Sequence, residues 1–541
     1  MDKTGTRKWW ALGALALATL AVGLDATVLS VALPTLAGAL HATETDLQWF
    51  SSGYLLVLAA AMLPVGLLGD RIGRKKVLVA CLLIFGAGSA ACAYATSAGA
   101  FIAARAVLGL AGAGIVVMNL SALTMLFTKE ERPRAVGVWA AANFLSLPVG
   151  PILGGWLLTN YWWGWVFLMN VPVALIGLIA ALALIPESRS PERPGLDVVG
   201  IVASTAGLVG VTYGLIEAGR NSWTDASALA PMIAGLVLLA GFLLWEKLLT
   251  SRPGGQPLID LTLFRSGSFT WGVILAGTAG LAMIGVLFTL PQYFQGVRGT
   301  DAMGSGVRLV PIIAGLVVGA VPADRLARLI GAKLTVAIGF ALLAAGMLIG
   351  STTGIGTGDG FLVIWLVVVG VGLGLTFSTS ASAALSEISQ ERSGVASAVM
   401  QALQKMGGPL GTAILGSVLS SVYLSKLDLA SLPAAVASVV RQSLFGGLAV
   451  AARLHSAALQ GMVRGAFVDG MDVSLVVAAG IAVAGVLLTL VFLPARATPA
   501  ASTGAAVKAA ASVTPTGPHL VGAANDEVAA ERGEEAYDSV S

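Results

Sequence analysis

Uninterrupted apolar runs of about twenty residues recur along this chain from Trp9 to Pro494, and they constrain its fold more than any other feature. The hydrocarbon core of a bilayer is ~30 Å thick and is crossed by a helix of ~20 apolar residues. Only 11% of the 541 residues are charged, against about a quarter in a soluble domain. The runs are continuous rather than alternating, which excludes a β-barrel. We therefore predict an all-α membrane protein whose solvent is mostly lipid.

Fourteen of these runs are predicted to be transmembrane helices. They lie at 10–37, 47–68, 76–95, 99–126, 135–158, 163–185, 198–218, 228–249, 269–291, 305–323, 332–351, 361–385, 395–423 and 472–494. Lys and Arg gather at the N-terminus and after every even-numbered span, whereas the loops 1–2, 3–4, 5–6 and 11–12 have none. Because cytoplasmic loops are the basic ones, both termini are expected in the cytoplasm. That parity favours fourteen spans over thirteen.

A basic loop and its degraded copy divide the chain. The loop at 66–76 reads GLLGDRIGRKK, and the segment at 323–333 reads ADRLARLIGAK. Both follow the second span of a six-span block, so we predict two pseudo-symmetric six-helix halves with two helices inserted between them. Such repeats are typical of secondary transporters.

The predicted parts are the first half at 1–190, the inserted helices and linkers at 191–255, the second half at 256–496 and a disordered cytoplasmic tail at 497–541. The tail is rich in Ala, Thr, Pro, Gly and Glu, a composition that favours disorder. Within the second half, 424–471 is expected to be a long outside loop, mildly amphipathic around 436–463, which would lie on the bilayer as a surface helix.

The sequence offers little for enzymatic or metal chemistry. Cys81 and Cys92 stand eleven residues apart in one predicted helix, about 16 Å along its axis, which is too far for a disulfide. The three histidines fall outside the spans, and there is no phosphate-binding Gly-x-x-x-x-Gly-Lys-Ser/Thr motif and no nucleophile–base set. We expect no enzyme, no metal, no cofactor and no nucleic-acid partner, which leaves the proton gradient as the energy source.

Two charged side chains inside predicted spans are candidates for proton coupling. Asp25 lies about midway along span 1, where a carboxylate costs ~2.5–3.5 kcal/mol on insertion scales. It needs a partner, a water-filled cavity or a proton, unless it lies hydrated near the outer end. Arg105, early in span 4, needs a counter-charge if it is buried, unless it snorkels toward the headgroups. In span 13, Lys405 stands beside Gln401 and Gln404 and is a weaker candidate for a polar cavity.

The basic loop after span 2 is a candidate conformational latch. Its residues are Gly66, Asp70, Arg71, Gly73 and Arg74. Topology alone explains its positive charge, but it does not explain an aspartate among the cations or the repeated glycines. We therefore predict a structural or gating role rather than substrate contact.

A small-residue motif in span 5 is a candidate hinge. Gly150, Pro151, Gly154 and Gly155 combine residues that let helices approach closely with a ring that breaks a backbone hydrogen bond. The alternative is ordinary helix packing.

Taken together, these segments resemble the major facilitator superfamily, specifically its fourteen-span drug–proton antiporter branch. The matching segments are the loop at 66–76, with the pattern Gly-x-x-x-Asp-Arg-x-Gly-Arg-Lys, the stretch 24–34 of span 1, Gln48-Trp49 with Tyr54 in span 2, and the antiporter-like motif at 150–155. The resemblance covers about residues 10–494. Two positions depart from it: Leu108 replaces a Gln of span 4, and Ser146 replaces a Gly before the antiporter motif.

The resemblance also implies roles for the candidate residues. It places Asp25 in proton coupling and in recognition of cationic drugs, and Arg105 in proton transfer. The aspartate of the latch, Asp70, would cap a neighbouring helix N-terminus and pair with an Arg, stabilising the outward-facing state. The motif at 150–155 would be a hinge between the halves.

We therefore expect a proton-coupled exporter of amphiphilic drugs or antibiotics that works by alternating access. Its expected place is the bacterial inner membrane, where it would act as a monomer. One alternative is a dedicated self-resistance exporter of a single natural product. The high alanine and glycine content is typical of a GC-rich bacterial genome, and the resemblance implies that such exporters are common in those genomes. A solute importer or a membrane sensor is less expected, because an importer leaves the span-5 motif unexplained and a sensor needs a folded signalling domain.

Overall fold

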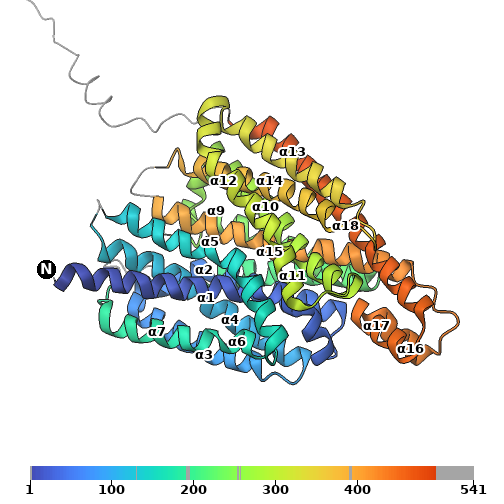
Figure 1. Cartoon of the computed structure of the whole chain (residues 1–541). Helices are drawn as coiled ribbons and strands as arrows, with labels where there is room; N and C mark the ends of the chain where they lie inside the picture. The colour runs from blue at the N-terminus through green and yellow to red at the C-terminus, as the bar shows by residue number, and fades with distance from the viewer. Residues whose placement is uncertain are drawn as a thin grey trace, which may run out of the picture. The chain divides into compact units, whose positions relative to one another are not determined.

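The computed structural model describes residues 3–128, 131–189, 195, 197–252, 255, 257–388 and 393–494. Within these ranges the regular structure is helical and contains no strand (Figure 1). The prediction of an all-α fold is therefore confirmed. The predicted disordered tail, 497–541, lies outside the described residues.

The first part of the chain forms a bundle of helices that alternate in direction. They are α1 (Lys3–Ala39), α2 (Glu44–Ile72), α3 (Arg74–Ala93), α4 (Ala98–Leu126), α5 (Arg132–Asn160), α6 (Trp165–Leu168) and α7 (Asn170–Leu184). Their core includes three edge-to-face aromatic rings, with Phe101 4.6 Å from Phe50 and 5.3 Å from Phe167 between ring centroids. Thr43 and Asp46 form a capping box that fixes the start of α2.

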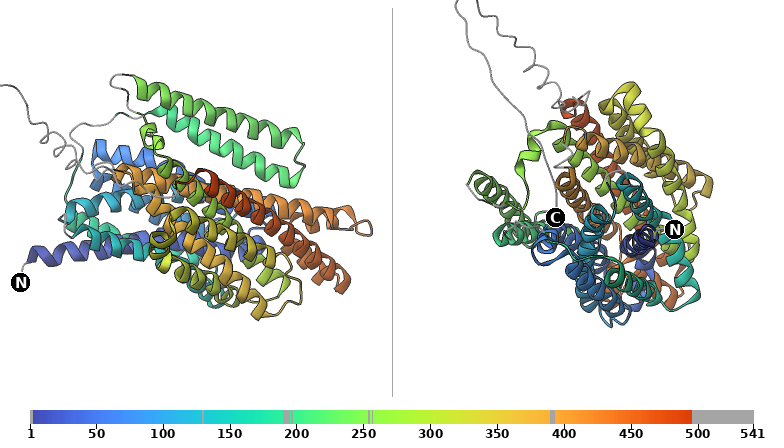
Figure 2. Two further views of the ribbon diagram at one scale, coloured as in Figure 1. Left: turned by 90° about the horizontal axis from the view of Figure 1, so that it is seen from above. Right: turned by 90° about the vertical axis from the view of Figure 1, so that its left-hand side faces the viewer.

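Two helices, α8 (Val198–Arg220) and α9 (Ala226–Ser251), form a hairpin that packs beside the bundle (Figure 2). Glycines bring their backbones together: a Cβ on Gly210 would lie 2.8 Å from the Pro231 carbonyl oxygen, and one on Gly235 would lie 2.6 Å from the Gly207 oxygen. α8 contacts α2 and α15, whereas much of α9 presents exposed apolar side chains. Such a surface suits lipid rather than water.

The remaining helices form a second bundle with its own core, which encloses Trp365 and Phe340. They are η1 (Leu261–Arg265), α10 (Gly267–Gln292), η2 (Tyr293–Val297), α11 (Ala302–Arg308), α12 (Val310–Ile330), α13 (Ala332–Gly350), α14 (Asp359–Leu385), α15 (Ser393–Ser425), α16 (Ala434–Gln442), α17 (Leu444–Arg453) and α18 (Ala457–Phe492). The residue boundaries of the two halves stay a prediction.

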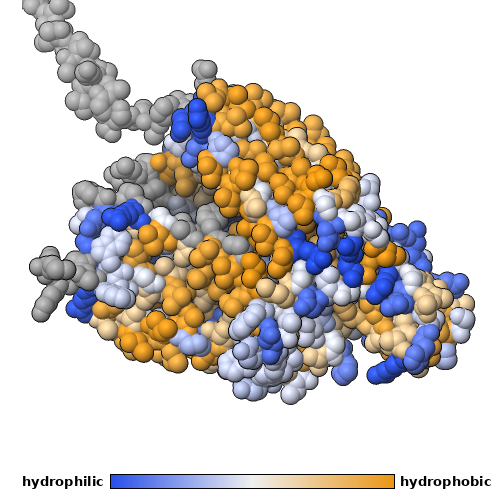
Figure 3. Space-filling view, viewed as in Figure 1, coloured by the Kyte–Doolittle hydropathy of each residue, from blue (hydrophilic) through white to orange (hydrophobic). Residues whose placement is uncertain are grey.

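Among the described residues, thirteen helices are long and apolar enough to cross a membrane, and each coincides with a predicted span. Exposed apolar side chains cover much of the visible surface of the bundle (Figure 3). The remaining predicted span, 135–158, lies within α5, which is helical throughout but is not one of the thirteen. The count of fourteen therefore stays a prediction.

The segment 424–471 is mostly helical, but it differs from the expected surface helix because its helices pack on the protein. α16 and α17 lie in it, and α18 already begins at Ala457. The Tyr423 hydroxyl donates a hydrogen bond to the Val440 carbonyl over 2.8 Å, and Val440 and Leu444 are almost fully buried. The apolar positions of this amphipathic stretch therefore face α15 and α18 instead of forming one helix on the bilayer.

The two bundles meet along two seams. The first seam joins α2 to α15. A Cβ on Gly416 would lie 2.9 Å from the Gln48 side chain, and one on Gly408 would lie 2.9 Å from Leu55. Between them, the Ser52 hydroxyl is 3.5 Å from the Pro409 carbonyl oxygen.

The second seam joins α5 to α11 through backbone contacts. A Cβ on Gly155 would lie 2.7 Å from the Ala302 oxygen and 2.8 Å from the Met303 Cα, and Gly306 packs against the Pro151 carbonyl. The Met303 amide donates a hydrogen bond to the Thr159 hydroxyl over 3.3 Å. Glycine is required at this seam because any side chain would push the helices apart.

We predict that Gly155→Ala destabilises the protein, whereas Gly137→Ala in the same helix does not. The first methyl group meets backbone atoms and the second has open space around it. Overpacking costs about 1–3 kcal/mol, whereas an alanine in open helix gains up to about 1 kcal/mol. Thermal unfolding in detergent should show a midpoint lowered by about 2 °C or more for Gly155→Ala. Equal midpoints for the two variants would contradict the proposed tight contact.

Candidate functional site

Asp25 of α1 and Arg105 of α4 form a buried ion pair. The Arg105 Nη1 donates a hydrogen bond to the Asp25 carboxylate. The Arg105 side chain is 1% exposed and the Asp25 side chain is 0% exposed. The second carboxylate oxygen accepts a hydrogen bond from Asn170 of α7 over 3.1 Å. The Arg105 Nε donates to the Phe50 carbonyl over 3.2 Å. Neither charge is hydrated at a surface, and Arg105 does not reach toward headgroups.

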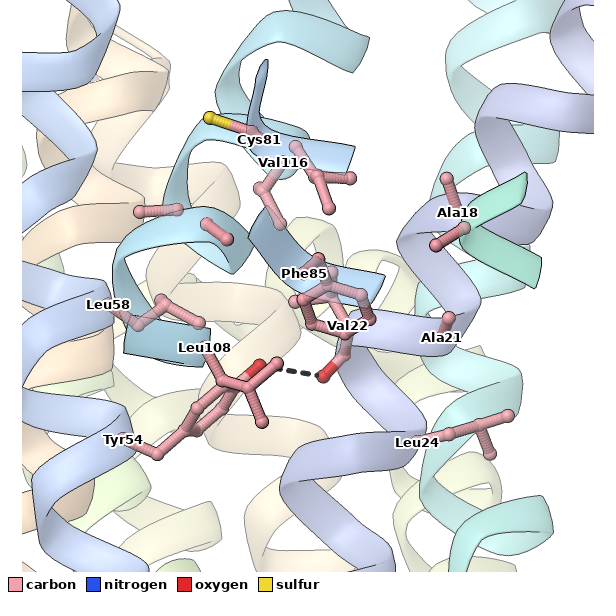
Figure 4. Packing of buried hydrophobic residues seen from close by; sticks show 14 of the residues in the cluster. Ala18, Ala21, Val22, Leu24, Tyr54, Leu58, Cys81, Phe85, Leu108 and Val116 are labelled. Carbon is pink, nitrogen blue, oxygen red and sulfur yellow. Dashed lines mark hydrogen bonds between the residues drawn. The ribbon is translucent and has the colours of Figure 1, made fainter. Parts of the chain in front are cut away.

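An aromatic ring covers the guanidinium of this pair. The Tyr54 ring of α2 lies 4.2 Å from the Arg105 Cζ, a distance at which a cation is attracted to the ring face. The Tyr54 hydroxyl donates to the Val22 carbonyl over 3.0 Å, which ties α2 to α1 (Figure 4). Leu108 lies in the same apolar cluster, so this departure from the family pattern leaves the pair without a further polar neighbour at that position.

Two partners of the ion pair were missed by the sequence analysis. Asn170 and the backbone of Phe50 satisfy the pair, and Asn170 also donates to the Ser89 hydroxyl over 3.3 Å. A lone asparagine in an apolar run is costly to bury without a hydrogen-bond partner, as Asp25 is. Asn170 could therefore have been predicted as a site residue from the sequence. The Phe50 carbonyl carries no comparable signal.

The candidate hinge packs on α1 directly beside Asp25. Gly150 faces the Thr27 hydroxyl, and a Cβ on Gly154 would lie 2.7 Å from a methyl carbon of Val28. The Thr27 hydroxyl donates to the Ser146 carbonyl over 2.9 Å. Since Pro151 and Gly155 form the second seam, one motif joins α1 on one side and the second bundle on the other.

The departure at Ser146 is explained by its neighbour on α1. The Ser146 hydroxyl occupies the space that a Cβ on Gly23 would fill. It donates a hydrogen bond to the Asn143 carbonyl over 2.6 Å. Gly23 of α1 is therefore the glycine that lets the two helices approach at Ser146.

The latch residues lie at the end of the bundle where α1 begins, which we call the basic end. Asp70 accepts a hydrogen bond from Arg74 over 2.7 Å, and both side chains are partly exposed. Arg71 is exposed, and Gly66 packs on Val117. The expected pairing of the aspartate with an arginine is present, whereas its cap on a neighbouring helix stays a prediction.

Gly73 has a backbone requirement of its own. Its φ of 123° is one that side chains disfavour, and a Cβ there would lie 2.6 Å from the Glu187 carboxylate. The same carboxylate accepts from the Lys75 amide over 3.2 Å, and the Arg74 amide donates to the Ser188 carbonyl over 2.8 Å. These contacts fasten the latch to the segment after α7 within the first bundle.

Polar contacts also link the bundles at the end opposite the basic end. The buried Glu44 of α2 lies 3.4 Å from the Gln292 amide nitrogen of α10. Gln295 donates to the Val31 carbonyl of α1 over 2.9 Å. Glu44 was not among the predicted site residues, because it lies at the edge of its apolar run. These links place the contact between the bundles mainly at the opposite end.

We predict that the effects of Asp25 and Arg105 substitutions on the stability of the folded protein are strongly non-additive. Asp25→Asn or Arg105→Gln leaves the other charge buried without a partner, at a cost of roughly 3–5 kcal/mol. The double variant removes both charges, so it should lose less than the sum of the single variants. Thermal unfolding of the four purified proteins in detergent measures this cycle. Additive losses would contradict the ion pair.

The comparisons with known proteins agree with this architecture. The sequence matches the Major Facilitator Superfamily over residues 15–412. It is 32% identical to the tetracenomycin C resistance and export protein of Streptomyces glaucescens, covering 88% of this chain and 90% of that protein. It is also 32% identical to the multidrug efflux pump LfrA of Mycolicibacterium smegmatis, covering 88% and 94%.

Further relatives and solved structures point the same way. The probable actinorhodin transporter of Streptomyces coelicolor is 32% identical over 76% of this chain and 72% of its own length. In fold, the chain is similar to a bacterial homologue of the human lysosomal transporter Spinster in an inward-facing, unoccupied conformation, with a TM-score of 0.65, 15% identity and coverage of 92% and 100%. The D-xylose–proton symporter gives a TM-score of 0.56 at 16% identity, with coverage of 90% and 98%. The chain therefore belongs to the Major Facilitator Superfamily.

Proposed function

We propose that this protein exports amphiphilic drugs or antibiotics in exchange for protons by alternating access. The buried Asp25–Arg105 pair is the observation that carries the proposal, because a carboxylate at this depth is a group that one proton neutralises. Relatives of this chain are named as an export protein for tetracenomycin C and as a multidrug efflux pump. The proposed place of action is the bacterial inner membrane.

Protonation of Asp25 would change the packing around it. The proton removes the negative charge that Arg105 faces, so the guanidinium is left to its bonds with the Phe50 carbonyl and the Tyr54 ring. Thr27, two residues further along α1, packs on Gly150 of α5. This gives the proton site a direct mechanical route to the hinge.

The hinge extends the route to the other bundle. Gly150 and Gly154 contact α1, while Gly155 contacts the backbone of Ala302 and Met303 in the first turn of α11. A shift of α1 against α5 is therefore passed to the second seam. One proton moving down ~100 mV releases ~2.3 kcal/mol, which is enough for roughly a 50-fold gradient of a neutral substrate.

The arrangement of contacts fits one state of this cycle. The basic end belongs in the cytoplasm by the positive-inside rule. The polar links Glu44–Gln292 and Gln295–Val31 then close the outer end. We assign the structure to a state closed to the outside, from which substrate cannot leave on that side.

A dedicated exporter of one natural product is the second candidate. It is favoured by the relatives named for tetracenomycin C and for actinorhodin. The mechanism is the same and the pocket is narrower. Transport of a single compound out of a chemically varied panel would favour this reading, and transport of many would favour the first.

We predict that everted membrane vesicles collapse their proton gradient when a transported compound is added, and that Asp25→Asn abolishes this response. The exchange needs a group that binds and releases a proton, and the asparagine amide does neither. Recovery of a quenched acridine dye measures the gradient while a panel of aromatic anions, cations and neutral compounds is added.

Asp428→Asn is the matched control, because Asp428 is an exposed aspartate at the opposite end of the bundle. It should respond like the wild type. Normal proton exchange by Asp25→Asn across the panel would rule out Asp25 as the coupling residue.

We also predict that cross-linking the second seam stops transport. Thr159→Cys and Met303→Cys replace residues already joined by a hydrogen bond, so a disulfide there would hold the outer end closed. Cys81 and Cys92 are replaced by Ser in this variant. Oxidation should abolish efflux and a reductant should restore it, while each single-cysteine variant is unaffected. Full efflux by the cross-linked protein would contradict alternating access at this seam.

A further inference from the structure

Lys405 is an ionisable side chain at mid-membrane depth that has no acidic partner among the described residues. It lies about 18 Å along α15 from Ser393, at 1.5 Å per residue. Its side chain is partly exposed, and no acidic side chain in the described ranges lies within ion-pair distance of it. A charge at this depth normally has a counter-charge or a functional ligand.

The helical spacing shows where Lys405 faces. Gly408 lies three residues later on the same side of α15. A Cβ on Gly408 would lie 2.9 Å from the Leu55 side chain of α2 and 3.5 Å from the Ile284 side chain of α10. Lys405 therefore stands one turn nearer the basic end, on the face that looks between the two bundles. α15 contacts α2, α8, α10 and α18, and the side of α15 that carries Lys405 is the side that packs on α2.

Aromatic and apolar groups lie around Gly280 of α10, which contacts Gln404, the residue before Lys405 in the chain. The Phe377 ring and the Gln404 carbonyl both approach Gly280 of α10, at 3.9 Å and 3.3 Å from the position of a Cβ there. One turn further along α10, Met283 lines a small apolar hollow between the bundles together with Pro151. The region between the bundles therefore holds a lysine on α15 and an apolar surface that includes Met283 of α10.

The charge balance of the site selects the sign of the ligand. Asp25 is paired with Arg105 and fully buried, so it is not a free carboxylate for a cation. The buried Glu44 carboxylate lies at the opposite end and is bonded to Gln292, so Lys405 has no counter-charge at its own depth among the described residues. We propose that the substrates of this transporter are aromatic, amphiphilic anions and that Lys405 binds their acidic group. This assignment rests on the proposed export function and names its substrate class.

Three probes with one ring system and fixed charges test the proposal. They are anthracene-9-sulfonate, 9-anthracenemethanol and (anthracen-9-ylmethyl)trimethylammonium, which are negative, neutral and positive. Equilibrium dialysis against the purified full-length protein in detergent gives their dissociation constants. The sulfonate should bind about tenfold or more tightly than the ammonium ion, as expected for one hydrogen bond to a charged group.

Variants at Lys405 locate the preference. Lys405→Met should weaken sulfonate binding about tenfold or more while the neutral alcohol binds as before, and Lys405→Arg should keep the sulfonate preference. Lys247→Met, which removes an exposed lysine of α9, is the matched control and should bind all three probes like the wild type.

Two results would overturn the proposal: an ammonium probe that binds the wild type as tightly as the sulfonate, or unchanged sulfonate binding by Lys405→Met. If Lys405→Met loses the neutral alcohol as well, it has misfolded and Lys405→Gln replaces it with the same expectations. Binding is measured without a gradient, so it does not depend on transport. A sulfonate preference without proton-coupled efflux overturns the proposed function alone, and efflux without that preference overturns this proposal alone.

Discussion

A buried charge inside a bilayer must be neutralised or bonded on every side, and the Asp25–Arg105 pair meets this requirement with groups from four helices. Asp25 comes from α1 and Arg105 from α4, while α2 supplies Phe50 and Tyr54 and α7 supplies Asn170. No one of these helices can move without changing the surroundings of a charge. The pair therefore defines how the first bundle is assembled, in addition to any proton that it binds.

Lipid gives helices no hydrophobic reason to associate, so close packing of small residues must hold the bundles together. α5 shows how one motif meets this need on two faces. Gly150 and Gly154 admit α1, and Gly155 admits the backbone of Ala302 and Met303. A helix that is tight on both sides transmits displacement rather than absorbing it. The motif on α5 packs on Thr27 of α1, two residues from Asp25, so it lies where a change at the ion pair would be felt.

Secondary-structure elements are easier to predict from this sequence than contacts are. Thirteen spans coincide with apolar runs because length and hydropathy are local properties. Asp25 and Arg105 were each recognisable by the cost of their burial, but their pairing joins residues 80 positions apart, and no local pattern records that. The amphipathic stretch after Tyr423 predicted helix correctly, yet its apolar face had two possible partners, lipid or protein. Only tertiary packing decides between them, and it favours the protein.

The charges of the site also limit how proton and substrate can be coupled. If the substrate were a cation bound by Asp25, a proton would displace it by direct competition for one carboxylate. An anion held by Lys405 does not compete in this way, because protonation of Asp25 makes the interior more positive and would favour the anion. Exchange then requires that the proton changes the shape of the pathway rather than its charge. The packing of Thr27 on Gly150 and of Gly155 on Ala302 is the described route by which it can do so. For an anionic substrate, the hinge is therefore part of the coupling mechanism itself.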